Sequence, residues 1–234
     1  MPSVVPREVS TDLSMLERLV DPRGQDVVDI GCGSGALARA LVVAGARVVA
    51  LEVSEEQLAP ALAGDGGSGV RYVVGCAQAL PLEDAAVDIA VFMRTLHHVP
   101  LEDITKALRE ARRVVGPGGT VYVAEPLAVG DFYALTSMIE DEFEARRAAQ
   151  SALAGAVEIG LERASTVEYD VELRFAGVDQ FRQLTVSVDP SRAEIFAAHT
   201  SELAEAFQRL GEPGERPGER CFLSPTRVDI LKPV

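Results

Sequence analysis

Apolar and polar positions follow two alternating patterns along the first half of the chain. Near-continuous apolar runs predict strands at 26–31, 47–53, 70–77, 87–93 and 120–126. Runs rich in Val, Ile and Leu are typical of strands that are covered on both faces. The segments between them have helical spacing, as in the series Leu101, Ile104, Leu108, Ala111 and Val115. After a short amphipathic helix over 9–20, this order predicts an α/β fold with a doubly wound, mostly parallel sheet.

The second half of the chain changes its pattern twice. After the fifth predicted strand, residues 131–164 have the pattern of a long helical insertion whose first half is acidic. Strict alternation over 167–175 then predicts a half-exposed strand, which we expect to pair antiparallel with the final apolar run at 227–233. A helix is expected over 192–210. The Gly, Pro and charged residues of 211–220 are expected to form a mobile loop.

Composition and charge limit the possible functions. The chain has 234 residues, 47% hydrophobic and 25% charged, which suits one sizeable globular domain. Its formal net charge of −14 would repel a phosphate backbone, so we expect no nucleic acid partner. The first residues lack a leader pattern, and no apolar run is long enough to span a membrane. These features predict a cytoplasmic protein without a membrane partner.

The cysteines do not suggest a metal or a disulfide. Cys32, Cys76 and Cys221 are widely separated and odd in number, and they lack the spacings of cysteine-based metal sites. We therefore expect no metal site, and we interpret the cysteines as buried thiols in a reducing compartment.

A glycine-rich stretch, DIGCGSGA at 29–36, follows the first predicted strand. Two patterns fit it. Gly31, Gly33 and Ala36 match the G-x-G-x-x-G/A turn of dinucleotide-binding proteins, whereas D-x-G-x-G-x-G matches Asp29, Gly31, Gly33 and Gly35. In both cases a strand that opens into a helix through glycines lets a ligand approach the backbone closely. Glu52, at the end of the second strand, suits the ribose of NAD or of an adenosyl cofactor equally well.

Blocks further along the chain distinguish the two cofactors. They are Gly75-Cys76-Ala77 before the Leu-Pro-Leu of 80–82, the segment 88–99 with its Leu-His-His-Val end, and the Pro-Gly-Gly of 117–119. Together with Asp29–Gly35 and Glu52, they resemble the class I S-adenosylmethionine-dependent methyltransferases of the type 11 branch over 26–126. The resemblance implies S-adenosylmethionine as cofactor. It also implies a Rossmann-like, seven-stranded, mostly parallel sheet with an antiparallel last strand.

The resemblance further implies how the chain is organised. We expect a single methyltransferase domain over 1–234, in which 21–130 form the cofactor-binding core. Residues 131–165 would be a helical insertion that acts as a lid, and 166–234 would supply C-terminal strands and a helix. In such a lid, Phe132, Tyr133 and Met138 are candidates for lining the acceptor pocket, with packing against the sheet as the alternative.

Family roles transfer to the matching positions. Gly31 and Gly33 would pass the methionine portion and the ribose over their backbones, with Asp29 and Gly35 completing the motif. Glu52 would bind the ribose hydroxyls and Val53 would pack on adenine. Ala77 would offer its backbone N–H to the adenine ring. The main-chain carbonyl of Arg94 would meet the cofactor's amino group.

Two positions depart from the family pattern. Cys76 stands where an Asp usually binds the adenine amine, and the loss of one such hydrogen bond costs about 0.5–1.5 kcal/mol. Gln78 is a candidate replacement. Arg94 is bulkier than the usual small residue, and its charge would either pair with the cofactor carboxylate or disfavour the sulfonium.

Methyl transfer demands alignment of the reacting atoms and needs a base only when the acceptor must lose a proton. His97 and His98 follow the fourth strand and titrate in a useful range, so they are candidate bases, with a structural role as the alternative. Glu125, at the end of the fifth strand, is a second candidate for contacting substrate.

The acceptor is expected to be a small molecule, methylated at O, N or C. The chain lacks the N/D-P-P-Y/F block of base and amide N-methylating relatives and the Pro-Cys nucleophile of cytosine C5 chemistry. Two other hypotheses remain: a non-catalytic cofactor-binding regulator or partner protein, and a protein or tRNA methyltransferase.

Overall fold

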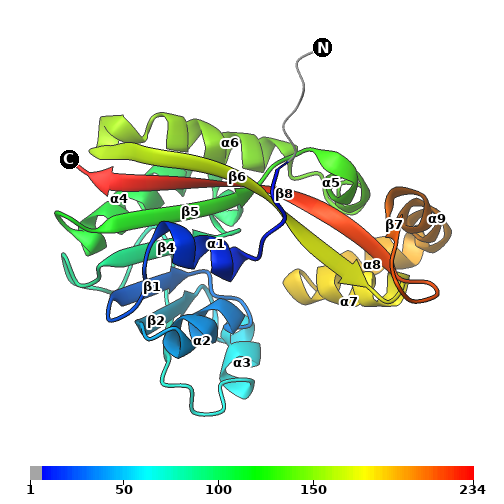
Figure 1. The fold of residues 1–234 in the computed structure, drawn as a ribbon, viewed down its shortest axis with the longest axis horizontal. Coiled ribbons are helices and arrows are strands. Elements are labelled where there is room, and N and C mark those ends of the chain that lie inside the picture. The colour runs from blue at the N-terminus through cyan, green and yellow to red at the C-terminus, as the bar shows by residue number, and fades with distance from the viewer. Residues whose placement is uncertain (1–6) are drawn as a thin grey trace. The chain divides into compact units, whose positions relative to one another are not determined.

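A computed structural model describes residues 7–234, and the order of its first elements matches the predicted alternation (Figure 1). The strands are β1 (Asp26–Ile30), β2 (Arg47–Glu52), β3 (Arg71–Val74), β4 (Ile89–Met93), β5 (Thr120–Pro126), β6 (Leu161–Phe175), β7 (Glu212–Pro213) and β8 (Arg220–Pro233). The α-helices are α1 (Asp12–Leu19), α2 (Ala36–Val43), α3 (Glu55–Ala63), α4 (Ile104–Val115), α5 (Gly130–Thr136), α6 (Phe143–Ala154), α7 (Val178–Val188), α8 (Arg192–Ala198) and α9 (Thr200–Leu210). Short 3-10 helices are η1 (Leu96–His98), η2 (Leu101–Asp103) and η3 (Ala156–Ile159).

The strands form one mostly parallel sheet. Its order is β3-β2-β1-β4-β5-β8-β6, with β7 paired to β8 (Figure 1). The end of β8 lies beside the starts of both neighbours, since Lys232 donates a hydrogen bond to Thr120 of β5 and the Val234 N–H donates to the Gly160 carbonyl before β6. β8 is therefore antiparallel to β5 and β6, and the predicted doubly wound architecture is confirmed with one additional short strand.

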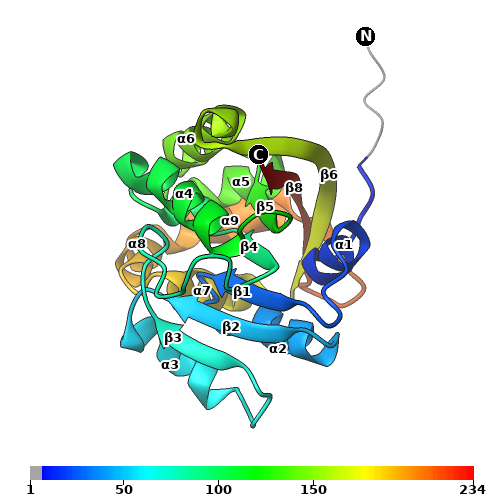
Figure 2. The same cartoon turned by 90° about the vertical axis from the view of Figure 1, so that its left-hand side faces the viewer.

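Apolar strands and helices build the core around the parallel strands. All of β5 is buried, and Val28, Phe92 and Val123 from three strands share one core cluster with Leu108 of α4. Figure 2 shows α1 and α2 on one side of the sheet and α4 and α6 on the other. The near-continuous apolar runs of the sequence thus correspond to strands covered on both faces.

The chain divides into two compact units, and the long strands β6 and β8 contribute to both. The first, which we call the sheet unit, comprises residues 12–125, 145–167 and 227–234. The second, the aromatic unit, comprises residues 7–11, 126–144 and 168–226. The predicted insertion over 131–165 is divided between them.

Phenylalanine side chains form the core of the aromatic unit. Phe132 stacks on Phe175 with ring centroids 6.2 Å apart and also meets Phe181 and Phe222, each within 6.3 Å. Edge-to-face and offset contacts of this kind stabilise a core beyond the area they bury. Phe132 therefore packs in this aromatic core, which is closer to the packing alternative than to a role in lining an acceptor pocket.

Several elements differ from the prediction. The helical part of the insertion ends at Ile159, and β6 begins at Leu161, because this segment pairs with β8, more than 60 residues away in the sequence. The sequence patterns did not reveal α7, the expected helix over 192–210 breaks at His199, and part of the expected loop forms β7. No helix in residues 7–234 has the length and apolar character needed to cross a membrane.

Candidate functional site

The turn between β1 and α2 requires glycine. Gly31, Gly33 and Gly35 have φ angles of 75°, 52° and 72°, in the left-handed region that side chains with a Cβ disfavour. The N–H groups of Gly31 and Cys32 both donate to the Leu51 carbonyl, at 2.8 and 3.0 Å. The turn is therefore fixed beside the end of β2.

Two glycines of this turn should respond differently to alanine. A Cβ on Gly31 would overlap the methyl group of Thr95, whereas a Cβ on Gly33 would meet nothing within 4 Å. Gly31→Ala is expected to lower the free energy of unfolding by about 3 kcal/mol or more, because overlap adds to backbone strain. Gly33→Ala should cost only about 1 kcal/mol. Urea unfolding of both variants checks this, and equal losses would contradict the assignment of Thr95 as the packing partner.

Glu52 joins the ends of β1 and β2. Its side chain is buried, one carboxylate oxygen accepts the Gly33 N–H at 2.9 Å, and the other accepts the Val53 N–H at 2.8 Å. Each oxygen keeps a second lone pair that a ligand hydroxyl could use. Val53 is 57% exposed directly after it and offers an apolar surface.

Asp29 places an unsatisfied carboxylate under the glycine turn. Its side chain is buried, and Oδ2 has no hydrogen-bond partner. Burial raises the pKa of Asp29 to about 7, and the Glu52 carboxylate adds to the shift. A buried, unpaired carboxylate oxygen is rare and needs an explanation. Burial, Asp29 and Glu52 also raise the pKa of Cys32 to about 12, so this thiol stays protonated.

The segment predicted to hold adenine forms a turn over residues 76–79. Cys76 is half-buried and pairs as an isolated bridge with Ala79, and Ala77 is buried. Gln78, the candidate replacement for the missing Asp, has its side-chain nitrogen 3.5 Å from Asp103. This is a long contact that a better acceptor could replace.

Arg94 has a partner that the sequence did not suggest. Its Nε and Nη2 each lie 3.2 Å from a carboxylate oxygen of Asp12, the first residue of α1. Its backbone is in the left-handed region, with φ 56°, and its N–H donates to the Ala124 carbonyl at 2.7 Å. The sequence suggested that this charge would either pair with the cofactor carboxylate or disfavour the sulfonium. It did not suggest an ion pair with Asp12, which is 82 residues away in the chain.

The three candidate catalytic residues lie together. Glu125 is buried, and its Oε1 accepts the N–H groups of Thr95 at 3.1 Å and Leu96 at 2.8 Å, while its Oε2 is hydrogen-bonded to Nδ1 of His97. His97 is buried, and its ring centroid lies 4.0 Å from that of the exposed His98. Because protein donors occupy both oxygens of Glu125, this carboxylate is arranged to act through His97 rather than as a solvated group.

Thr95 connects this pair to the glycine turn, and sequence reasoning missed it. Its hydroxyl lies 3.3 Å from the Gly31 carbonyl and 3.0 Å from the Met93 carbonyl, and its N–H donates to Glu125. The only sequence signal was its position two residues beyond the fourth strand, where ligand-contacting residues of such sheets gather.

Comparison with known proteins agrees with the geometry. A sequence family described as methyltransferase domain matches residues 28–123. A 27-O-demethylrifamycin SV methyltransferase from Amycolatopsis mediterranei is 30% identical over 198 residues, covering 81% of this chain and 64% of the relative. A ubiquinone biosynthesis O-methyltransferase from Pseudomonas putida is 34% identical over 113 residues, covering 47% of this chain and 48% of the relative. The chain thus spans less than two thirds of the length of these relatives.

Solved structures share the fold. A putative methyltransferase from Bacillus halodurans superposes with a TM-score of 0.66 at 22% identity, covering 96% of this chain and all of that one. A [4+2]-cyclase superposes with a TM-score of 0.59 at 20% identity, covering 100% of this chain and 88% of the other. The architecture therefore hosts more than one chemistry.

Proposed function

We propose that this chain, whose residues 28–123 match the methyltransferase family of the type 11 branch, methylates a hydroxyl group of a small molecule with S-adenosylmethionine as donor. The observation that carries the proposal is the buried His97–Glu125 pair, which Thr95 links to the glycine turn. Two relatives support oxygen as the acceptor atom. The ubiquinone relative is named an O-methyltransferase, and the name of the rifamycin relative describes an O-demethyl substrate.

The residues at the turn fit this cofactor better than a dinucleotide. S-adenosylmethionine carries an ammonium and a sulfonium group, and the orphaned Oδ2 of Asp29 is a ready partner for a cation. Asp29 and Glu52 together would repel the pyrophosphate of a dinucleotide. The open space above Gly33 admits a ligand to the backbone, and Glu52 and Val53 would hold ribose and adenine.

The protein's own contribution to the chemistry would be orientation and proton transfer. When bound, S-adenosylmethionine supplies an electrophilic methyl group. Glu125 accepts the Nδ1 proton of His97 in a hydrogen bond, which selects the tautomer whose Nε2 carries a lone pair. That Nε2 would take the proton of the acceptor hydroxyl as its oxygen bonds to the methyl carbon, while the carbon–sulfur bond breaks and S-adenosylhomocysteine leaves. The burial of His97 and Glu125 keeps bulk water from competing.

Glu52→Gln is expected to weaken binding of S-adenosylhomocysteine about tenfold or more. The side-chain amide nitrogen of the glutamine would face one of the two backbone N–H groups that now donate to the carboxylate. One acceptor for the ribose hydroxyls would also be lost. Isothermal titration calorimetry measures the effect, with the exposed Glu56→Gln as matched control. A larger loss in His97→Ala than in Glu52→Gln would refute these roles.

The acceptor class can be tested with methyl-labelled cofactor and a panel of phenols, amines and carboxylic acids. We expect label on phenolic oxygen. Label on amines alone would overturn the acceptor assignment, and tight cofactor binding without any product would favour the non-catalytic regulator.

We also propose that the protein acts in the cytoplasm and not on nucleic acid. The net charge of −14 supports the second part, because it would repel a phosphate backbone.

A further inference from the structure

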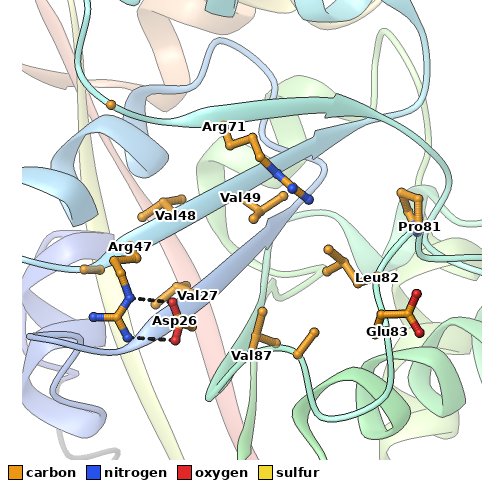
Figure 3. Close-up of a pocket in the computed structure, with 13 residues that line it drawn as sticks. Asp26, Val27, Arg47, Val48, Val49, Arg71, Pro81, Leu82, Glu83 and Val87 are labelled. Atoms are coloured by element: carbon orange, nitrogen blue, oxygen red, sulfur yellow. Dashed lines mark hydrogen bonds and ion pairs between the residues drawn. The ribbon is translucent and has the colours of Figure 1, made fainter.

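The sheet unit has a cavity that lies away from the glycine turn. It has a volume of about 640 Å³ and is bordered by the first residues of three strands, Asp26 of β1, Arg47 of β2 and Arg71 of β3, and by the segment 81–87 (Figure 3). The glycine turn follows the opposite end of β1, a strand of five residues that is roughly 15 Å long. A ligand here would not overlap the proposed cofactor.

The wall formed by segment 81–87 is held in place from α4. The Arg113 guanidinium donates to the Leu82 carbonyl at 2.7 Å and to the Leu80 carbonyl at 3.0 Å, and Glu110 accepts both the Leu80 N–H and the same guanidinium. The N–H of Val87 donates to the Val114 carbonyl at 3.0 Å. The cavity is therefore formed before any ligand arrives, which limits the entropy lost on binding.

Two charged side chains that border the cavity form an ion pair with each other, and Arg71 does not join it. Asp26 and Arg47 neutralise each other through two hydrogen bonds of 2.6 and 2.7 Å (Figure 3). Arg71 has no ion pair or hydrogen bond from its guanidinium to any of residues 7–234. Figure 3 shows its side chain extending from β3 toward the segment that carries Leu82, while the exposed Glu83 is turned the other way. Arg71 is thus the charge available to a ligand.

We propose that this cavity is a second ligand site, which binds a small carboxylate with an apolar body. The planar guanidinium of Arg71 would bind the carboxylate through two parallel hydrogen bonds. Val49, Leu82 and Val87 would contact the apolar part, since all three line the cavity between the sheet and the segment opposite (Figure 3). The site is independent of methyl transfer.

Benzoate tests this proposal by amide chemical-shift titration of the full chain. It should shift residues 47–49, 71 and 82–87 with a dissociation constant of about 1 mM or below. Benzamide, its neutral isostere, should bind about fivefold more weakly or worse. Arg71→Gln should weaken benzoate by a similar factor. Arg109→Gln, which removes another exposed positive charge, on α4, should leave it unchanged.

Three outcomes would overturn the site. They are no saturable shifts at these residues, equal benzoate affinity in Arg71→Gln, and tighter binding of benzylammonium than of benzoate, which would identify Glu83 as the group that selects the ligand. Addition of S-adenosylhomocysteine should not displace benzoate, so failure of this proposal is distinguishable from failure of the methyltransferase assignment.

Discussion

Glu125→Gln should reduce the turnover number about 10²- to 10⁴-fold while cofactor affinity stays within about threefold. The amide oxygen can still accept the N–H groups of Thr95 and Leu96, so the local backbone is retained. The amide nitrogen, however, would donate to Nδ1 of His97 instead of accepting from it. That reversal moves the imidazole proton to Nε2 and removes the base.

Steady-state kinetics with a phenolic acceptor measure the effect. The dependence of the turnover number on pH provides a readout that a purely structural role would not change, because removal of the base should alter the profile in the same way in Glu125→Gln and in His97→Ala. His98→Gln is the matched control, since His98 is exposed and has an adjacent ring, and it should lose less than about tenfold. Equal losses at His97 and His98, with the pH profile unchanged, would contradict the proposed base.

Asp29→Asn is expected to stabilise the cofactor-free protein by about 2–4 kcal/mol at pH 8 and by less than half as much at pH 5. Burial raises the pKa of Asp29 from 3.8 to about 7 in the folded state. Between these values the folded state holds a proton that the unfolded state has lost, so stability falls progressively as the pH rises from about 3.8 to about 7 and changes little above that. Asparagine does not ionise and avoids the loss.

Urea unfolding at the two pH values checks the sign. Cofactor affinity should change in the opposite direction: in the wild type it should rise between pH 6 and 8 as Asp29 ionises, and in Asp29→Asn it should be weaker and flat. A variant that is less stable at pH 8, or whose cofactor affinity follows the wild-type pH dependence, would rule out Asp29 as the group that meets the ligand's positive charge.

The sequence predicted local features better than distant ones. The fifth apolar run was expected at 120–126, which is where β5 lies, and the helical spacing from Leu101 to Val115 corresponds to α4. These features depend on short-range patterns of burial. The sequence predicted that 167–175 pairs with the final strand, as β6 does with β8, but it did not predict that β6 starts at Leu161, because residues 161–166 depend on this distant pairing rather than on a strand pattern of their own.

The candidate site followed the same rule. Motif spacing located the glycine turn, Glu52 and the two histidines, because each follows a strand end. Motif spacing did not reveal the hydrogen bond between Glu125 and His97 or the ion pair between Asp12 and Arg94, because both contacts join segments that are distant in the sequence. The departure at Arg94 is thereby explained by the N-terminal helix rather than by the ligand.

Mass spectrometry can follow methyl transfer from S-adenosylmethionine whose methyl group carries three deuterium atoms to the panel of phenols, amines and carboxylic acids. We expect a product in which the intact trideuterated methyl group is attached to a phenolic oxygen, formed in equal amount with S-adenosylhomocysteine and lost in Glu125→Gln. Unlabelled products, or saturable cofactor binding with no labelled product from any acceptor class, would contradict it.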